Sequence, residues 1–193
     1  MNAHDYALLA QEAYSAKPDI GAAGSASRAI VRQTAAGLVV AFPGTDNLPC
    51  VGADINIALM AVAGAGDVHR GFWDAWKAIS APVTSAIGGQ PVTLVGHSLG
   101  AAIAIMAAVD MTLAGRAPSA VYGFEPPRVS PGIGVRTLLA NVRVSLFKNG
   151  GDLVPDLPLG WSHAALLTHI GKPALPNVPD HLIARVIRSL SAA

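Results

Sequence analysis

The chain has 193 residues and a formal net charge of +1, with 13% charged and 52% hydrophobic residues. Lysine and arginine form no run anywhere along it, so the electrostatic footprint of a nucleic-acid-binding protein is missing. The length predicts a single domain over residues 1–193, and the apolar composition suits either a heavily buried sheet or contact with a lipid surface.

The cysteine content and the apolar runs indicate the cellular location that the sequence predicts. Cys50 is the only cysteine, so an intrachain disulfide is excluded. The first residues carry Asp5 and Glu12 and lack a basic start followed by an apolar run, so no secretory signal peptide is predicted. The longest apolar stretch, 101–109, is far shorter than the ~20 residues that cross a bilayer. We expect no transmembrane anchor, and a chain that is cytoplasmic or exported without a classical signal peptide.

Hydrophobic periodicity and breaker residues predict alternating strands and helices. Strands are expected at 28–33, 37–42, 92–95, 120–124 and 142–147. Helices are expected over an amphipathic first segment (1–19), from about 68 to 87, over the Ala-rich residues 101–108, and at 180–189. Loops are expected over 43–67 and in the proline-rich segment after 150. Apolar strands that alternate with helices predict a mostly parallel central sheet flanked by helices, a three-layer α/β architecture.

Residues 91–102, PVTLVGHSLGAA, hold the strongest local motif. A GxSxG pattern alone also arises by chance in a glycine-rich chain, but an apolar strand before it and an apolar helix after it favour a nucleophile elbow. Side chains at Gly96 or Gly100 would collide with neighbouring backbone, and the sharp turn exposes the hydroxyl of Ser98. The start of the helix, including the amide of Leu99, would then face a developing oxyanion.

A serine nucleophile needs a histidine base and an acid that orients it, here in the chain order serine, acid, histidine. The acids and histidines after the serine are Asp110, Glu125, Asp152, Asp156 and Asp180, and His163, His169 and His181. Asp152 lies just past the predicted strand 142–147, at the edge of the sheet where the elbow lies, which favours it as the acid. No histidine pair has metal-ligand spacing with a matching third ligand, so we expect neither a metal nor another cofactor.

Several segments together resemble one family. They are AFPGTDN (41–47), VHRGF (68–72), TLVGHSLGAA (93–102), YGFEPPRV (122–129) and NGGDLVPDLP (149–158). Their order and approximate spacing resemble the class 3, or fungal-type, lipases of the α/β-hydrolase superfamily, over roughly residues 38–181. The resemblance implies an α/β-hydrolase fold and a serine ester hydrolase that needs no cofactor.

The resemblance also implies roles for single residues. Ser98 matches the nucleophile and Asp152 the acid. His181, in LPNVPDHLI, resembles the family's proline-rich approach to the catalytic histidine, whereas His163, in GWSH, resembles an earlier segment that follows the acid. His181 is also farther from Asp152 along the chain, which leaves a loop long enough to return over the elbow. We therefore favour His181 as the base and keep His163 as the alternative.

The same resemblance makes Thr45, in FPGT, the second oxyanion donor beside Leu99. Residues 46–67 depart from the family, whose members often carry an amphipathic lid helix here and a tryptophan where this chain has Cys50. The apolar side chains of this segment either form a small lid or lipid-facing rim or simply pack on the core. They are Ile57, Leu59, Met60 and Val62.

The favoured function is hydrolysis of acylglycerols, phospholipids or smaller carboxylic esters through an acyl-enzyme on Ser98. The expected partners are a lipid or small ester substrate and, transiently, a lipid interface. An acyltransferase or thioesterase would use the same triad and differ only in the acceptor or the bond attacked. A catalytically idle module that holds lipid or a protein partner in an apolar cleft is the alternative from another class.

Overall fold

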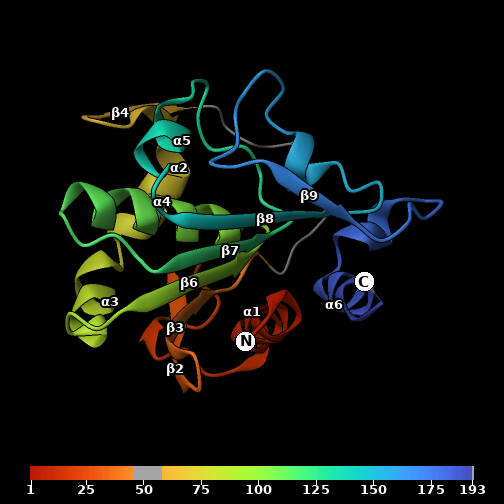
Figure 1. The fold of residues 1–193 in the computed structure, drawn as a ribbon, viewed down its shortest axis with the longest axis horizontal. Helices are drawn as coiled ribbons and strands as arrows, with labels where there is room; N and C mark the ends of the chain where they lie inside the picture. Colours follow the sequence, from red (N-terminus) through yellow and green to blue (C-terminus); the bar gives the residue numbers. More distant parts are fainter. Residues whose placement is uncertain (46–57, 193) are drawn as a thin grey trace.

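The computed structural model describes residues 1–45 and 58–192, and a seven-stranded sheet lies at the centre of this part of the chain (Figure 1). Its strands are β1 (Ile20–Gly21), β2 (Arg28–Thr34), β3 (Gly37–Phe42), β6 (Val92–His97), β7 (Ala120–Phe124), β8 (Arg143–Asn149) and β9 (Leu167–Ile170), in that spatial order. The first three pair antiparallel, and every later neighbour pairs parallel. The carboxyl ends of β3, β6, β7 and β8 therefore meet along one edge of the sheet.

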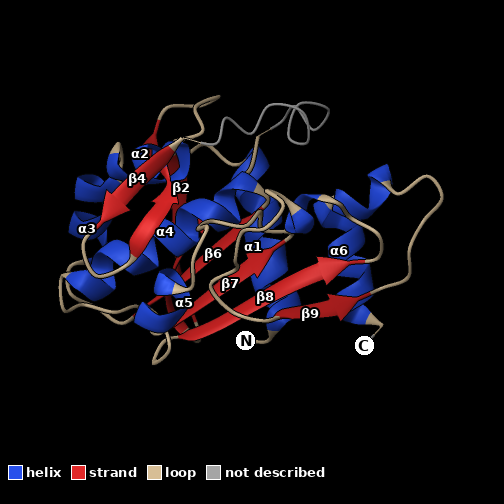
Figure 2. Cartoon of the chain, turned by 90° about the horizontal axis from the view of Figure 1, so that it is seen from above, coloured by secondary structure: helices blue, strands red, loops and turns tan. Residues whose placement is uncertain are grey.

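Helices cover both faces of the sheet, which confirms the predicted three-layer fold (Figures 1 and 2). One face carries α2 (Arg70–Lys77), α3 (Ser80–Ile87), α4 (Leu99–Leu113) and α5 (Gly134–Leu138). The opposite face carries α1 (Ala3–Ser15) and α6 (Ile183–Ser191), which pack side by side. Within the described residues, we find no helix with the length and apolar character needed to cross a membrane.

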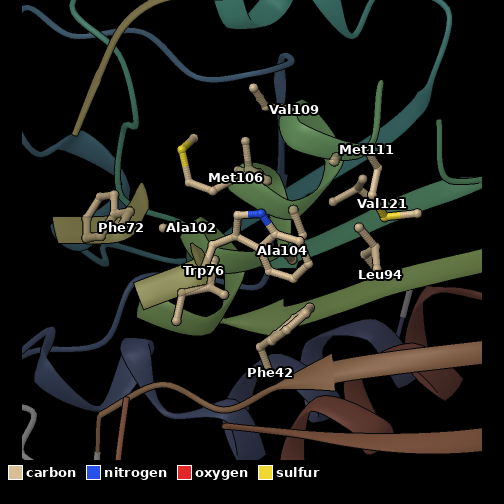
Figure 3. Close-up of a cluster of buried hydrophobic side chains, with 14 of the residues drawn as sticks. Phe42, Phe72, Trp76, Leu94, Ala102, Ala104, Met106, Val109, Met111 and Val121 are labelled. Atoms are coloured by element: carbon tan, nitrogen blue, oxygen red, sulfur yellow. The ribbon is translucent and has the colours of Figure 1, made fainter. Parts of the chain in front are cut away.

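The core on the α4 side explains why this helix is so rich in alanine. Residues 100–109 of α4 are all buried between the sheet and α2. Figure 3 shows Trp76 of α2 against α4, with Phe42 of β3 below it; the two rings meet edge to face, with centroids 6.3 Å apart. The indole Nε1 donates to Asp110 Oδ2 at 2.9 Å, so the one polar atom of this large side chain is satisfied. Small residues let α4 lie close to the strands, which positions its first turn at the end of β6.

The region before α3 differs from the sequence prediction in two ways. The expected loop over 43–67 contains β4 (Leu59–Val62), which pairs with β5 (Gly66–His69) in a hairpin whose turn uses Gly64 at φ +86°. The expected single helix from 68 to 87 is divided into α2 and α3, because Pro82 has no N–H to donate to Ala78 and its ring disfavours a continuous helix. The short strands were missed because their apolar residues show no clear alternation.

The C-terminal segment also holds more regular structure than predicted. β9 lies within the proline-rich stretch after 150 that was expected to be loop. It is a sheet edge with Thr168 and His169 exposed, so it lacks the apolar pattern of a buried strand. The last helix begins at Ile183 rather than Asp180, because residues 178–181 form a short 3₁₀ helix, η3, whose second residue is Pro179. The remaining predicted strands are confirmed within two residues at their ends. The first helix is confirmed as well, but it ends at Ser15, four residues before its expected end.

Two glycines permit the sharp turn from β6 into α4. A side chain at Gly96 would overlap the backbone of Gly100, and one at Gly100 would overlap the carbonyl oxygen of Phe42 on the neighbouring strand. The steric role predicted for both glycines is confirmed. The first turn of α4 can therefore rest directly against the ends of β3 and β6.

We predict that Gly100→Ala lowers the free energy of unfolding by about 3 kcal/mol or more, because the new methyl group would overlap the backbone of Phe42 and Pro43, which cannot give way. Chemical denaturation followed by circular dichroism measures this. Gly132→Ala is the matched control: its added Cβ meets no atom within 4 Å, so a change within about 0.5 kcal/mol is expected. Equal stability of Gly100→Ala and the parent would contradict the close-approach argument.

Candidate active site

Ser98 lies at the centre of the sheet edge, directly after β6. Its backbone has φ +56°, a left-handed value that is rare for a residue with a side chain. The amide of Ser98 donates to the carbonyl oxygen of Phe124 at 2.8 Å, which continues the ladder between β6 and β7 for one residue beyond the strand. The strained turn is held by its neighbours on both sides, as is common where function requires an unfavourable conformation.

The side chains of Ser98, His181 and Asp152 form one chain of hydrogen bonds. His181 Nε2 lies 2.9 Å from Ser98 Oγ, and His181 Nδ1 lies 2.6 Å from Asp152 Oδ2. Because the carboxylate can only accept, Nδ1 carries the hydrogen, and Nε2 is left to accept from the serine hydroxyl. All three side chains are buried. Burial raises the pKa of Asp152, but hydrogen bonds with His181 and Glu125 outweigh this effect and hold that pKa below its usual value.

Asp180 joins the loop that carries His181 to the loop that carries Asp152. Its Oδ2 accepts from the amides of Gly151 and Ala174, both at 2.9 Å, and the side chain is fully buried. Its carbonyl oxygen accepts from Asn149 Nδ2 at 2.9 Å, at the end of β8. The position of His181 is therefore set from both sides by backbone that is itself tied to the sheet.

His97, the residue before the serine, supports His181 from below. Since the carbonyl oxygen of His181 can only accept, His97 Nε2 donates to it at 2.8 Å, and His97 Nδ1 accepts from the Tyr14 hydroxyl at 2.6 Å. Burial, reinforced by the nearby His181, lowers the pKa of His97 to about 3. A neutral His97 therefore links α1 to the backbone of the histidine that faces Ser98.

The other candidate residues lie elsewhere. His163, the alternative base, is buried and its Nε2 donates to the carbonyl oxygen of Pro155 at 2.7 Å; burial lowers the pKa of His163 to about 4. His169 is exposed on β9. Asp110 accepts from Trp76 in the core, and Asp156 pairs with Lys148 at 2.6 Å.

The two expected oxyanion donors occupy adjoining segments. Leu99 opens α4, so its amide has no acceptor within the helix. Thr45 is half-buried and follows Gly44, where an added Cβ would lie 3.0 Å from the Cβ of Ser98. The loop after β3 thus runs directly beside the serine.

The expected lid segment is only partly within the described residues. Positions 46–57, with Cys50 and Ile57, lie outside them. In β4, Val62 is buried in the core, Met60 packs against that core, and Leu59 is 42% exposed. Of the two alternatives for these three residues, packing on the core holds for Val62 and Met60.

Glu125 is a residue near the site that sequence reasoning named only as one of several acids. It is fully buried, has φ +52°, and lies with Asp152 and His181 so that one O or N atom of each is within 4.8 Å of the others. This is the group among the described residues whose spacing could suit a metal ion. However, its histidine nitrogen already bonds Asp152 at 2.6 Å, so a metal there would have to break the link between His181 and its acid.

A serine on a strand-to-helix elbow, hydrogen-bonded to a histidine and an acid that follow it in the chain, is the architecture of the α/β hydrolases. Comparison with known families narrows this class. The family model for Lipase (class 3) matches residues 39–161, and the chain belongs to this family. The match includes Ser98 and Asp152 and ends before His181.

Individual relatives agree with the family. Residues of this chain are 31% identical over 105 positions to the secreted mono- and diacylglycerol lipase A of Penicillium cyclopium and of Penicillium camembertii. These matches cover 49% of this chain and 34% of the relative, so this chain matches only about a third of the length of those relatives.

Solved structures show the same fold at lower identity. The Rhizomucor miehei triacylglyceride lipase superposes with a TM-score of 0.72 and 19% identity over 87% of this chain and 78% of its own. A triacylglycerol lipase whose catalytic centre is formed by a serine protease triad superposes with a TM-score of 0.68 and 19% identity over 88% and 78% of the two chains.

We predict that Tyr14→Phe lowers the free energy of unfolding by about 1–3 kcal/mol, because Nδ1 of the buried His97 loses its donor. Thermal and urea unfolding measure the loss. Tyr6→Phe is a control on the same helix, since the described residues offer no hydrogen bond to the Tyr6 hydroxyl. Equal losses of unfolding free energy in the two variants would show that the Tyr14–His97 hydrogen bond does not stabilise the fold.

Proposed function

We propose that the protein is a serine carboxylic ester hydrolase that works through an acyl-enzyme on Ser98. The observation that carries this proposal is the unbroken hydrogen-bond chain from Ser98 through His181 to Asp152, in a member of the class 3 lipase family. Alone, a serine hydroxyl is a weak nucleophile at neutral pH, and this arrangement provides both a base and an orienting acid.

In the first half of the reaction, Ser98 Oγ attacks the acyl carbonyl carbon while His181 Nε2 takes the hydroxyl proton. The bond to the alcohol oxygen then breaks, and His181 returns the proton to that oxygen. In the second half, His181 takes a proton from water while the water oxygen attacks the acyl-serine. The bond between the acyl carbon and Ser98 Oγ then breaks, His181 returns the proton to Oγ, and the carboxylic acid leaves. Asp152 accepts from Nδ1 throughout and stabilises the imidazolium that forms in each half.

For the oxyanion, we propose the amides of Leu99 and Thr45. Two observations support this: Leu99 is the first residue of α4 and follows the serine directly, and Thr45 follows Gly44, where an added Cβ would lie 3.0 Å from the Cβ of Ser98. The positive end of the α4 dipole adds to the stabilisation of negative charge there.

The substrate we propose is a lipid ester of the acylglycerol class. Leu153 and Leu182 directly follow Asp152 and His181 in the chain and are 60% and 43% exposed, so exposed apolar side chains stand next to two triad residues in the sequence. Such side chains suit an acyl chain and a transient contact with a lipid interface. The names of the Penicillium relatives, secreted lipases of mono- and diacylglycerols, support both this substrate class and export of the protein.

We predict that Ser98→Ala abolishes ester hydrolysis and covalent labelling by an organophosphonate, and that His181→Ala lowers kcat roughly ten-thousandfold. His163→Gln is the matched control and retains most of the activity, because His163 bonds Pro155 rather than Ser98. Turnover of p-nitrophenyl butyrate measures all three, with circular dichroism to check folding. A folded, inactive His163→Gln together with an active His181→Ala would reverse the assignment of the base.

We also predict a preference for mono- and diacylglycerols over phosphatidylcholine, with rising kcat/KM from two-carbon to eight-carbon p-nitrophenyl esters. The exposed leucines beside the reacting groups favour longer acyl chains. Fatty-acid release and initial rates measure the preference. Release of phospholipid acyl chains at an equal rate would broaden the substrate class, and ester formation with added alcohols in preference to hydrolysis would identify an acyltransferase.

A further inference from the structure

Glu125 occupies on β7 the place that Ser98 occupies on β6. Each is the first residue after its strand, and the amide of Glu125 donates to the carbonyl oxygen of Phe147 at 2.9 Å, just as that of Ser98 donates to Phe124. Among the described residues, these two are the non-glycine residues with positive φ. A glycine would adopt this conformation without strain, so the presence of a glutamate there calls for a role of its side chain.

The carboxyl group of Glu125 joins two parts of the site. Its Oε1 accepts from the amide of Asn149 at 2.5 Å, and one of its oxygens lies within 4.8 Å of a carboxyl oxygen of Asp152. Asp152 has its own partners on the other sides: Oδ2 faces His181, and Oδ1 accepts from the amide of Val154 at 3.1 Å. The described residues provide no N–H or O–H to the buried Oε2 of Glu125.

Two buried carboxyl groups can share a hydrogen bond only if one of them keeps its proton. Burial, with added effects from Asp152, raises the pKa of Glu125 to about 11, whereas the pKa of Asp152 is held below its usual value. The charged groups that face Glu125 are Asp152, with His181 behind it, and Lys148, whose Nζ is already paired with Asp156 at 2.6 Å. These directions favour Glu125 as the carboxyl group that keeps the proton.

We propose that Glu125 is a positioning residue that stays a neutral carboxylic acid and donates a hydrogen bond to the Asp152 carboxylate, which holds that carboxylate toward His181. This role rests on the proposed function only in so far as Asp152 orients a catalytic base. With this bond, Glu125 at the end of β7 and Asn149 at the end of β8 together hold Asp152 in place.

The neutral state also keeps the charge of the site at one negative group instead of two. A second carboxylate beside His181 would stabilise its imidazolium before substrate arrives and so weaken it as a base at neutral pH. A neutral Glu125 instead donates a hydrogen bond to Asp152, and the site keeps a single negative charge beside His181.

Three substitutions at this position separate the side-chain role from a backbone role. Glu125→Gln keeps an acceptor for Asn149 and a donor for Asp152, in one amide orientation, and cannot ionise. Glu125→Leu keeps bulk but removes both hydrogen bonds. Glu125→Gly removes the side chain and relieves the backbone strain, so it remains informative if the leucine variant fails to fold.

Ester turnover as a function of pH tests the positioning role. We expect Glu125→Gln to stay within about threefold of the parent, and Glu125→Leu and Glu125→Gly to lose about tenfold to a hundredfold in kcat with little change in KM, the effect of one hydrogen bond to a charged group. In the last two variants, Asp152 becomes a stronger acceptor, so the acid limb of the kcat/KM profile moves to higher pH. Glu125→Gln keeps the acid limb in place.

Two readouts that need no turnover test the proton on Glu125 directly. Infrared difference spectra at pH 7 show a protonated-carboxyl band in the parent that is absent from Glu125→Gln. Because the folded protein keeps a proton that the unfolded chain releases near pH 4.5, the parent loses stability from Glu125 as pH rises from about 4.5 toward 11. The melting temperature of Glu125→Gln therefore rises relative to that of the parent as pH increases from 5 to 9.

Each contrary result overturns a defined part of the proposal. A Glu125→Gln variant whose acid limb moves to lower pH, with no infrared band in the parent, shows that Glu125 is ionised. Full activity in Glu125→Gly shows that only the backbone matters. Activity that chelation by EDTA removes and a divalent metal restores shows that Glu125, Asp152 and His181 bind a cation instead. If the parent and Ser98→Ala were equally inactive on esters, the proposed function would fail. The infrared and melting data would still show whether Glu125 keeps its proton, because neither measurement depends on turnover.

Discussion

The close approach of α4 to the ends of β3 and β6 is the constraint on which the rest of the site depends. With Gly100 packed against the carbonyl of Phe42, there is no space for a side chain at this position between helix and sheet. This contact forces the left-handed backbone at Ser98 and directs the start of the helix toward the reacting groups. The parallel register then brings the residues after β7 and β8, Glu125 and Asp152, to the same edge.

Many of the hydrogen bonds that support the triad end on backbone groups. Asp180 accepts from two amides, Asn149 donates to a carbonyl, and His97 donates to the carbonyl of His181. Backbone groups have fixed positions once the sheet is formed, so they hold a side chain more rigidly than another side chain would. The buried polar groups are costly to desolvate, and this dense pairing offsets the cost.

The sequence was sufficient for those parts of the fold in which local pattern and tertiary environment agree. The apolar runs of β3, β6 and β7 were predicted correctly because both faces of these strands are buried. β9 and the β4–β5 hairpin were missed because edge strands and short hairpins take their structure from pairing rather than from periodicity. The juxtaposition of Ser98, Asp152 and His181 followed from chain order and family resemblance.

What local sequence could not show is any link between distant side chains. Tyr14 lies in an unremarkable amphipathic helix, and nothing nearby in the chain points to His97. Glu125 was visible as an acid directly after a strand, but its burial and its contact with Asp152 depend on how β7 and β8 align. Such contacts become evident only when the elements are placed in three dimensions.

The hydrogen bond between Tyr14 and His97 links the active site to α1, which is far from Ser98 in the sequence. Ser98 and its elbow are formed from the middle of the chain, whereas the histidine that faces the serine arrives with the segment before α6, and the tyrosine beneath it arrives with α1. α1 and α6 contact each other on the same face of the sheet. The complete hydrogen-bond network around the serine therefore requires segments from both ends of the described chain to be packed on the same face of the sheet.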